Sequence, residues 1–286
     1  MTAARPPIPP MFCSAELAAR IDQAEARLMT AIAREAGARD ASLRPFVVPL
    51  GCGVAIYAGP HSPSNKMIGV GFGESLDPAV LDDLEARFAA LDTPLQAEIS
   101  VLADPEVHAQ LAARGYRPSG FENVLGHPLD GGGEPLPDHV RVEPVADGDI
   151  AELGEILVSA FASPDVGGVG GDATPPADVI RRYFAITMSV DGFRGYVARV
   201  DGAIAGGGSL RIDGTVAQFC GAGTLPVFRR RGVQTALFRA RLADAAAAGC
   251  DVGVVITQPG SKSQQNAQRA GFALLYARQL LIKPSR

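Results

Sequence analysis

The stretch that decides the fold runs from Val227 to Ala236 and reads Val-Phe-Arg-Arg-Arg-Gly-Val-Gln-Thr-Ala. It follows a strand-like run that ends at Pro226 and opens directly into an alanine-rich segment of helical character. A helix that begins at such a turn presents unpaired backbone N–H groups and the positive end of its dipole, and the arginines add positive charge there. Three arginines alone are usually a solvated helix end. The glycine and the strand-to-helix position favour a site for a phosphorylated ligand.

Length and composition indicate an ordinary globular protein of two domains. The 286 residues exceed one typical domain, and 47% hydrophobic with 20% charged residues provide apolar surface for two cores. The net charge of −5 argues against a nucleic-acid partner, which normally requires a basic face. The sequence has no apolar run of the roughly 18 to 20 residues that span a membrane, and residues 1–10 lack a secretory pattern. We therefore expect a cytoplasmic protein without a membrane partner, either a monomer or a homodimer.

The cysteines and histidines form no pattern typical of a metal site or a disulfide framework. The cysteines are far apart without a Cys-x-x-Cys pair, and the histidines have no partner at helical spacing. We interpret the cysteines as small buried hydrophobes and the histidines as structural or surface residues, and we expect no metal. They are Cys13, Cys52, Cys220 and Cys250, and His61, His108, His127 and His139.

A junction divides the chain into two halves. Residues 129–137 contain three glycines and two prolines without helical or strand period, which is typical of a linker. We predict domains at residues 1–130 and 140–286, joined by a linker at 131–139.

The second half shows an alternation of strand and helix patterns. The glycine- and proline-rich segment 163–176 has no apolar face and predicts a mobile lid. Asp201-Gly202 and Asp213-Gly214 both predict two-residue hairpin turns, which gives a three-stranded meander. The expected strands are 140–144, 193–200, 203–212, 215–224, 251–257 and 272–282, and the expected helices are 147–161, 177–190, 232–249 and 261–270.

With this order of elements, residues 140–283 resemble the GCN5-related N-acetyltransferase (GNAT) superfamily. The family motif that holds acetyl-CoA is Arg/Gln-x-x-Gly-x-Gly/Ala, and residues 229–234 match it except that Gln234 replaces a small residue. The resemblance implies an α/β (mixed α+β) fold of mostly antiparallel mixed sheets flanked by helices.

The first half shows a weaker form of the same pattern. Ala113-Arg114-Gly115-Tyr116 aligns with Arg269-Ala270-Gly271-Phe272, and the spacing from Gly115 to Pro128 equals that from Gly271 to Pro284. We infer a tandem repeat with a degenerate N-terminal copy, with coincidence between generic αβ segments as the alternative. In this copy residues 78–90 are predicted to be helical and residues 95–101 to form a strand. Residues 67–75 lead into the helix without a basic residue, and Glu74 would repel a pyrophosphate. The first half is therefore expected to shape the acceptor site or act as a scaffold.

The resemblance also implies positions for the cosubstrate, acetyl-CoA. Backbone N–H groups of residues 231–235 are expected to surround the pyrophosphate, with side chains from Arg229 and Arg230, while the strand end pairs with the pantetheine arm. Ser261 is better explained as a helix cap with Gln264 three residues later. The expected cofactor-binding residues are Gly223, Thr224, Leu225, Arg229, Arg230, Arg231, Gly232, Val233, Gln234, Thr235, Ser263 and Asn266.

The sequence indicates the catalytic groups less clearly than the cofactor-binding residues. Family members often carry a tyrosine, as general acid, four residues before the Gly-Phe pair, but here that position is Ala267. Tyr276 is the candidate acid, with Tyr196 as an alternative, and Cys220 is a functional side chain of the 215–224 strand, which contains no carboxylate. A thiolate leaves readily near neutral pH, so a missing acid does not forbid catalysis.

These features predict an N-acetyltransferase that moves an acetyl group directly from acetyl-CoA to an amine of a small molecule or peptide. One alternative is a non-catalytic acetyl-CoA sensor or interaction module, which binding without turnover would indicate. Another is a protein that binds a different phosphorylated ligand.

Overall fold

The computed structural model describes residues 11–129, 139–145, 150–161 and 176–285. The predicted linker at 131–139 and the predicted lid at 163–176 lie, apart from their last residues, outside the described part. None of the described helices is long and apolar enough to cross a membrane.

The first half contains the helix and strand predicted at its centre, together with elements that were not predicted. The helix over 78–90 and the strand beginning at Leu95 are confirmed. The elements are α1 (Ala15–Arg39), the short 3-10 helix η1 (Ala41–Leu43), β1 (Phe46–Leu50), β2 (Gly53–Tyr57), β3 (Lys66–Ile68), α2 (Pro78–Ala90), β4 (Leu95–Ser100), α3 (Pro105–Ala113) and β5 (Arg117–Pro128).

The second half follows the predicted order, with shifts of a few residues at several ends. The elements are β6 (Val140–Pro144), α4 (Ile150–Phe161), α5 (Ala177–Thr187), β7 (Phe193–Val200), β8 (Ala203–Asp213), β9 (Val216–Thr224), the 3-10 helix η3 (Pro226–Phe228), α6 (Val233–Ala247), β10 (Val252–Thr257), α7 (Lys262–Arg269) and β11 (Ala273–Lys283). The mixed α/β class is therefore confirmed.

The two hairpins of the meander differ in how well the sequence placed their turns. The β7–β8 turn is formed by Asp201 and Gly202, both with positive φ (51° and 84°), as the sequence predicts. In the β8–β9 hairpin Asp213 pairs with Val216, so the loop residues are Gly214 and Thr215 rather than Asp213 and Gly214. Only Gly214 needs positive φ there (60°), and the predicted turn was wrong by one residue.

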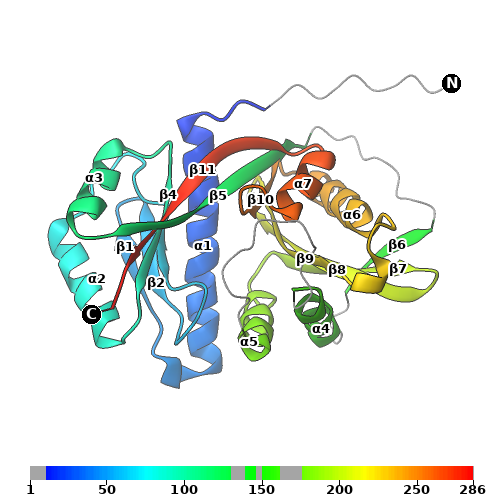
Figure 1. Cartoon of the computed structure of the whole chain (residues 1–286), viewed down its shortest axis with the longest axis horizontal. Helices are drawn as coiled ribbons and strands as arrows, with labels where there is room; N and C mark the ends of the chain where they lie inside the picture. The colour runs from blue at the N-terminus through cyan, green and yellow to red at the C-terminus, as the bar shows by residue number, and fades with distance from the viewer. Residues whose placement is uncertain (1–10, 130–138, 146–149, 162–175, 286) are drawn as a thin grey trace.

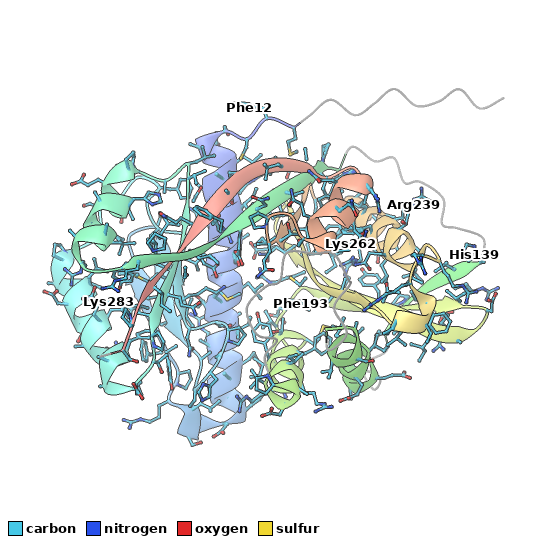
Figure 2. The ribbon with its side chains drawn as sticks, in the orientation of Figure 1. Phe12, His139, Phe193, Arg239, Lys262 and Lys283 are labelled. Carbon is cyan, nitrogen blue, oxygen red and sulfur yellow. The ribbon has the colours of Figure 1, made fainter. Side chains whose placement is uncertain are left out.

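The strands of the described residues join one 11-stranded sheet in the order β1-β2-β3-β4-β11-β5-β10-β9-β8-β7-β6. The last strand of each half pairs with the other half: β11 pairs antiparallel with β4, and β5 pairs antiparallel with β10. Strands β5 and β11 also pair with each other at the centre. The halves therefore exchange their final strands, and Figure 1 shows β11 carrying the C terminus to the side of α2. Figure 2 places Lys283 on that side and Lys262 of α7 on the other.

Helices cover both faces of the sheet. Helices α2 and α3 pack on one face of the first half, with Leu81, Phe88 and Leu111 in its core. Helices α6 and α7 cover the second half, with Leu237 and Ala267 in the core there. On the opposite face α1 crosses the middle of the molecule, with α4 and α5 beside it (Figure 1). The exchanged strands thus lie beneath α1.

Helix α1 was not predicted, because its buried face is not uniformly apolar. Ser14 caps its first turn by accepting a hydrogen bond from the N–H of Leu17 (3.1 Å). Its buried positions include Ile21 and Ile32, which follow helical spacing, but also the acidic residues Asp22 and Glu25. Two carboxylates on the inward face weaken the amphipathic pattern that identifies a surface helix.

Candidate functional site

The arginine-rich turn adopts an open, irregular backbone before α6. Arg230 has φ 62° and Gly232 has φ 77°, so two residues of the turn lie in the left-handed region. Gly232 is the N-cap of α6, and the cap is made without a side-chain hydrogen bond. The first N–H groups of α6 are therefore left for a ligand or for water, which is the arrangement that binds anions. Glycine tolerates the left-handed conformation without strain.

The first turn of α6 is anchored in the core by buried side chains, while the arginine-rich turn before it is exposed. Val233 and Ala236 are buried in the core of the second half, whereas Arg230, Arg231 and Thr235 are exposed. The predicted cofactor-binding residues of the turn are thus brought together on one exposed helix end. Their role remains a prediction.

Gln234 is the residue at which the motif departs from the family pattern. It is half-buried, and its Oε1 atom is enclosed without a hydrogen-bond donor among the described residues. A longer side chain is therefore accommodated beside the turn at the cost of one unpaired acceptor.

Arg231 points to the neighbouring hairpin. Its guanidinium forms an ion pair with Asp201 in the β7–β8 turn (2.8 Å) and lies 5.7 Å from the centre of the Phe228 ring. The ring nitrogen Nε2 of His139 lies 3.0 Å from the carbonyl oxygen of Arg231, at the edge of the second half (Figure 2). His139 was expected to be a structural or surface residue, and its contact with the turn carried no signal in the sequence.

Strands β9 and β10 diverge beside the turn. Their parallel pairing covers only Val216 to Gln218 on β9 and Val252 to Val254 on β10. Farther along, β9 bulges at Gly221 (φ 26°), where the register with β8 shifts. The second half of β9 therefore has an edge that does not pair with β10. Such an edge can accept an extended ligand by strand addition.

The predicted pantetheine residues lie along this edge. Gly223 is buried and a side chain at its position would meet the Cβ of Ala160 at 2.4 Å, so α4 approaches the backbone closely there. Thr224 ends β9, and the N–H of Leu225 donates to the carbonyl of Ala205 (2.9 Å). The edge is thus held in place from the β8 side.

The far side of the gap is formed by the end of β10 and the start of α7. Ser261 accepts a hydrogen bond from the N–H of Gln264 (3.1 Å), which confirms it as the helix cap. Ser263 is exposed and Asn266 is half-buried on α7. The hydroxyl of Thr257 is buried without a hydrogen-bond partner among the described residues.

A buried charge network lies beneath α1 at the centre of the sheet. Asp22 accepts hydrogen bonds from Arg278 (2.6 Å) and from the hydroxyl of Tyr276, and Glu25 accepts from Arg278 (2.5 Å). Lys66 donates to Glu98 (2.6 Å), whose other oxygen lies 3.8 Å from the Arg278 guanidinium. We use the name buried charge network for Asp22, Glu25, Lys66, Glu98, Tyr276 and Arg278. Its partners are distant in sequence, so no local motif could have revealed it.

The structure places the candidate catalytic side chains on the face under α1. Tyr276 is 3% exposed, and burial raises its pKa while its proton is already engaged by Asp22. Cys220 is half-buried on β9, and burial raises the pKa of its thiol to about 12, so the thiol is protonated near neutral pH. Tyr196 donates instead to Asp244 of α6 (2.7 Å). The catalytic roles of Tyr276 and Cys220 remain predictions.

Tyr276→Phe separates a structural from a catalytic role of this hydroxyl. We expect the free energy of unfolding to fall by about 1 to 3 kcal/mol, because Asp22 loses a donor in a buried site. Turnover is expected to be nearly unchanged. Chemical denaturation and steady-state kinetics measure the two quantities, and a large loss of turnover in a protein of normal stability would favour the general acid.

Comparisons with known proteins show which sequences and folds this chain resembles. Residues 164–272 match the model described as Acetyltransferase (GNAT) family. Among solved structures, a GCN5-related N-acetyltransferase from Kribbella flavida has a TM-score of 0.67 at 20% identity, covering 94% of this chain and 96% of that chain. A GCN5-related N-acetyltransferase from Sphaerobacter thermophilus gives 0.55 at 18% identity (82% and 72% covered). A tandem GNAT protein from the clavulanic acid biosynthesis pathway gives 0.57 at 16% identity (85% and 82% covered). No curated protein matches the chain.

Proposed function

Because residues 164–272 match the Acetyltransferase (GNAT) family model, we propose that the protein transfers an acetyl group from acetyl-CoA to an amine of a small molecule or peptide. The pyrophosphate of the cosubstrate would lie at the first turn of α6, and the pantetheine arm would follow the unpaired edge of β9. The observation that carries the proposal is that an uncapped, glycine-led helix start lies beside two diverging strands. The cytoplasmic location remains a prediction.

The corresponding region of the first half supports assigning a single cosubstrate site to the second half. Strand β3 pairs with β4 along its whole length, and the carbonyl of Gly71 accepts a hydrogen bond from the N–H of Asp104 (2.8 Å). The segments that follow these two strands are therefore tied together. Asp77 caps α2 with its own carboxylate, through the N–H of Ala79 (2.8 Å). An anion would meet a negative charge at that helix start.

A non-catalytic sensor of acetyl-CoA is the second candidate. It is favoured by the engagement of the Tyr276 hydroxyl with Asp22, and by the absence of a carboxylate on β9. The two functions share the cosubstrate site and differ only in turnover.

Calorimetry with acetyl-CoA tests the shared site, and release of free thiol in the presence of a panel of primary amines tests the transfer. We expect binding in the micromolar range or tighter, with thiol release that depends on the amine. Binding without thiol release across the panel would favour the sensor. A failure to bind at high micromolar concentration, or a preference for ADP over the intact thioester, would contradict the proposal.

A further inference from the structure

Glu122 lies at the centre of the sheet, just beyond the end of β10. Thr257, the last residue of β10, pairs with Asn123 of β5, so Glu122 is the next residue past that end. Alternate strand residues share a face, and Val124 packs in the cluster that α1 covers. The side chain of Glu122 therefore projects on the α1 face. The strand exchange thus brings a carboxylate of the first half to the mouth of the gap between β9 and β10.

Glu122 and Arg278 occupy equivalent positions in the two copies. Each lies seven residues after the glycine that follows a helix, Gly115 or Gly271, and the two face each other in the β5–β11 pairing. Arg278 is bound by carboxylates of α1. The carboxylate of Glu122 has no hydrogen bond or ion pair with any described residue. The two copies therefore differ at this position: Arg278 is paired with carboxylates, whereas Glu122 is unpaired among the described residues and lies beside the gap between β9 and β10.

Charged groups from four elements face Glu122. They are Glu25 of α1, Lys66 of β3, Glu98 of β4 and Arg278 of β11. The pKa of Glu122 is raised to about 8, because burial and the charge of Glu98 raise it more than Lys66 and Arg278 lower it. A carboxylate in this range can both accept and release a proton near neutral pH.

Glu122 is partly exposed, as are side chains from three neighbouring elements. Glu122, Cys220, Tyr183 and Ile256 are each half-buried, and they come from β5, β9, α5 and β10. The charge of Glu25 raises the pKa of Glu122, of Cys220 and of Tyr183. These three side chains therefore lie near the same position of α1.

Two oxygens of the buried charge network, whose members Glu98, Lys66 and Arg278 influence Glu122, lack donors. Asp22 Oδ2 and Glu98 Oε2 are enclosed without a hydrogen-bond donor among the described residues, in side chains that are 1% and 8% exposed. A buried acceptor without a donor is costly. An ammonium group brings three N–H donors and a positive charge, so its chemistry complements this region.

We propose that Glu122 accepts the proton of a primary aliphatic ammonium substrate, held between α1, α5 and the open ends of β9 and β10. The inference rests on the proposed acetyl transfer. It makes the first half a contributor of a catalytic residue as well as a scaffold.

The Glu122 carboxylate takes one proton from the ammonium nitrogen and later releases it to water. The freed lone pair of the amine forms the C–N bond to the thioester carbonyl carbon, and the C–S bond then breaks with its electron pair leaving on sulfur. The second proton lost by the nitrogen goes to that sulfur. The products are an amide, a thiol and one proton in solution.

Glu122→Gln tests the inference. We expect kcat to fall by roughly 10²- to 10⁴-fold, with acetyl-CoA affinity unchanged. In the wild type kcat is expected to rise with pH through an apparent pKa near 8, and this limb is expected to disappear in the variant. Carbon-13 NMR of side-chain carboxyl groups in the free protein provides a readout independent of turnover. We expect one glutamate resonance that titrates near pH 8 in the wild type and is missing in Glu122→Gln.

Glu106→Gln, an exposed residue of α3, is the matched control and is expected to change neither readout. Glu122→Asp retains a carboxyl group and is expected to recover part of the turnover. Equal kcat and an equal pH limb in wild type and Glu122→Gln would overturn the inference while leaving the proposed function intact. If acetyl-CoA does not bind the wild type, the proposed function itself fails, and a missing NMR titration near pH 8 would overturn the assignment of Glu122 separately.

Discussion

Gly232→Glu is expected to raise the dissociation constant for acetyl-CoA by about 100-fold or more, equal to about 3 kcal/mol. The substitution places a negative charge and extra bulk at the N-cap of α6, where the cosubstrate's pyrophosphate is proposed to bind. Like charges at a helix start cancel the attraction that the dipole gives to an anion. The left-handed φ of 77° adds about 1 to 2 kcal/mol of strain for a residue with a side chain. Isothermal calorimetry measures the affinity, and circular dichroism checks the fold.

Gly249→Glu provides the control for this prediction. Gly249 follows the other end of α6, also has positive φ (81°), and a side chain there would meet no atom within 4 Å. The control therefore shares the backbone strain and the added charge, but lies away from the proposed site. It is expected to bind acetyl-CoA like the wild type. Equal affinities for Gly232→Glu and the wild type would remove the pyrophosphate site from this turn.

Arg278→Met is expected to lower the free energy of unfolding by about 3 to 5 kcal/mol, because removing one partner of a buried ion pair leaves the other charge uncompensated. Arg278 is fully buried and is the partner of both Asp22 and Glu25. Methionine keeps most of the side-chain volume, so the loss reports mainly the charge. Urea denaturation at pH 7 measures it. Arg117→Met, on the exposed part of β5, is the control and is expected to change stability little.

The penalty of Arg278→Met is expected to shrink as the pH falls from 7 to 5. Burial already raises the pKa of Asp22, and Arg278 is the largest influence that opposes this rise. Without the guanidinium the pKa of Asp22 rises further, so the folded state binds a proton that the unfolded state releases near pH 4. Stability is then lost as pH rises through the folded pKa and recovered as pH falls. A penalty that grows toward pH 5 would contradict this account, as would a triple variant Asp22→Asn, Glu25→Gln and Arg278→Met that is as unstable as the single one.

Local patterns predicted the features that depend on local chemistry. Gly232 marks the start of α6, the Asp201-Gly202 pair marks its hairpin, and Ser261 marks the start of α7. The Asp213-Gly214 pair predicted the second turn one residue too early. Gly214 is the first loop residue and alone has positive φ, and Thr215 is the second.

The features that the sequence did not reveal depend on partners far along the chain. Helix α1 was not predicted because Asp22 and Glu25 interrupt its apolar face, and their partner Arg278 is more than two hundred residues away. The strand exchange was equally hidden, because alternation along β5 indicates a strand but not its neighbour. Glu122 becomes a candidate only because β5 pairs with β10 of the second half. These are the residues on which the acceptor side of the proposed site depends.

The exchanged strands also affect how the chain folds during translation. During translation β4 emerges early, but β11, the strand that lies against it, is synthesised after every other strand described here. The sheet of the first half therefore keeps an exposed edge at β4 until the second half has left the ribosome, and such edges invite pairing with other chains. Long-range pairing of this kind slows folding and prolongs exposure of incomplete sheets. The nascent protein accordingly depends on a late, single closing step for both of its halves.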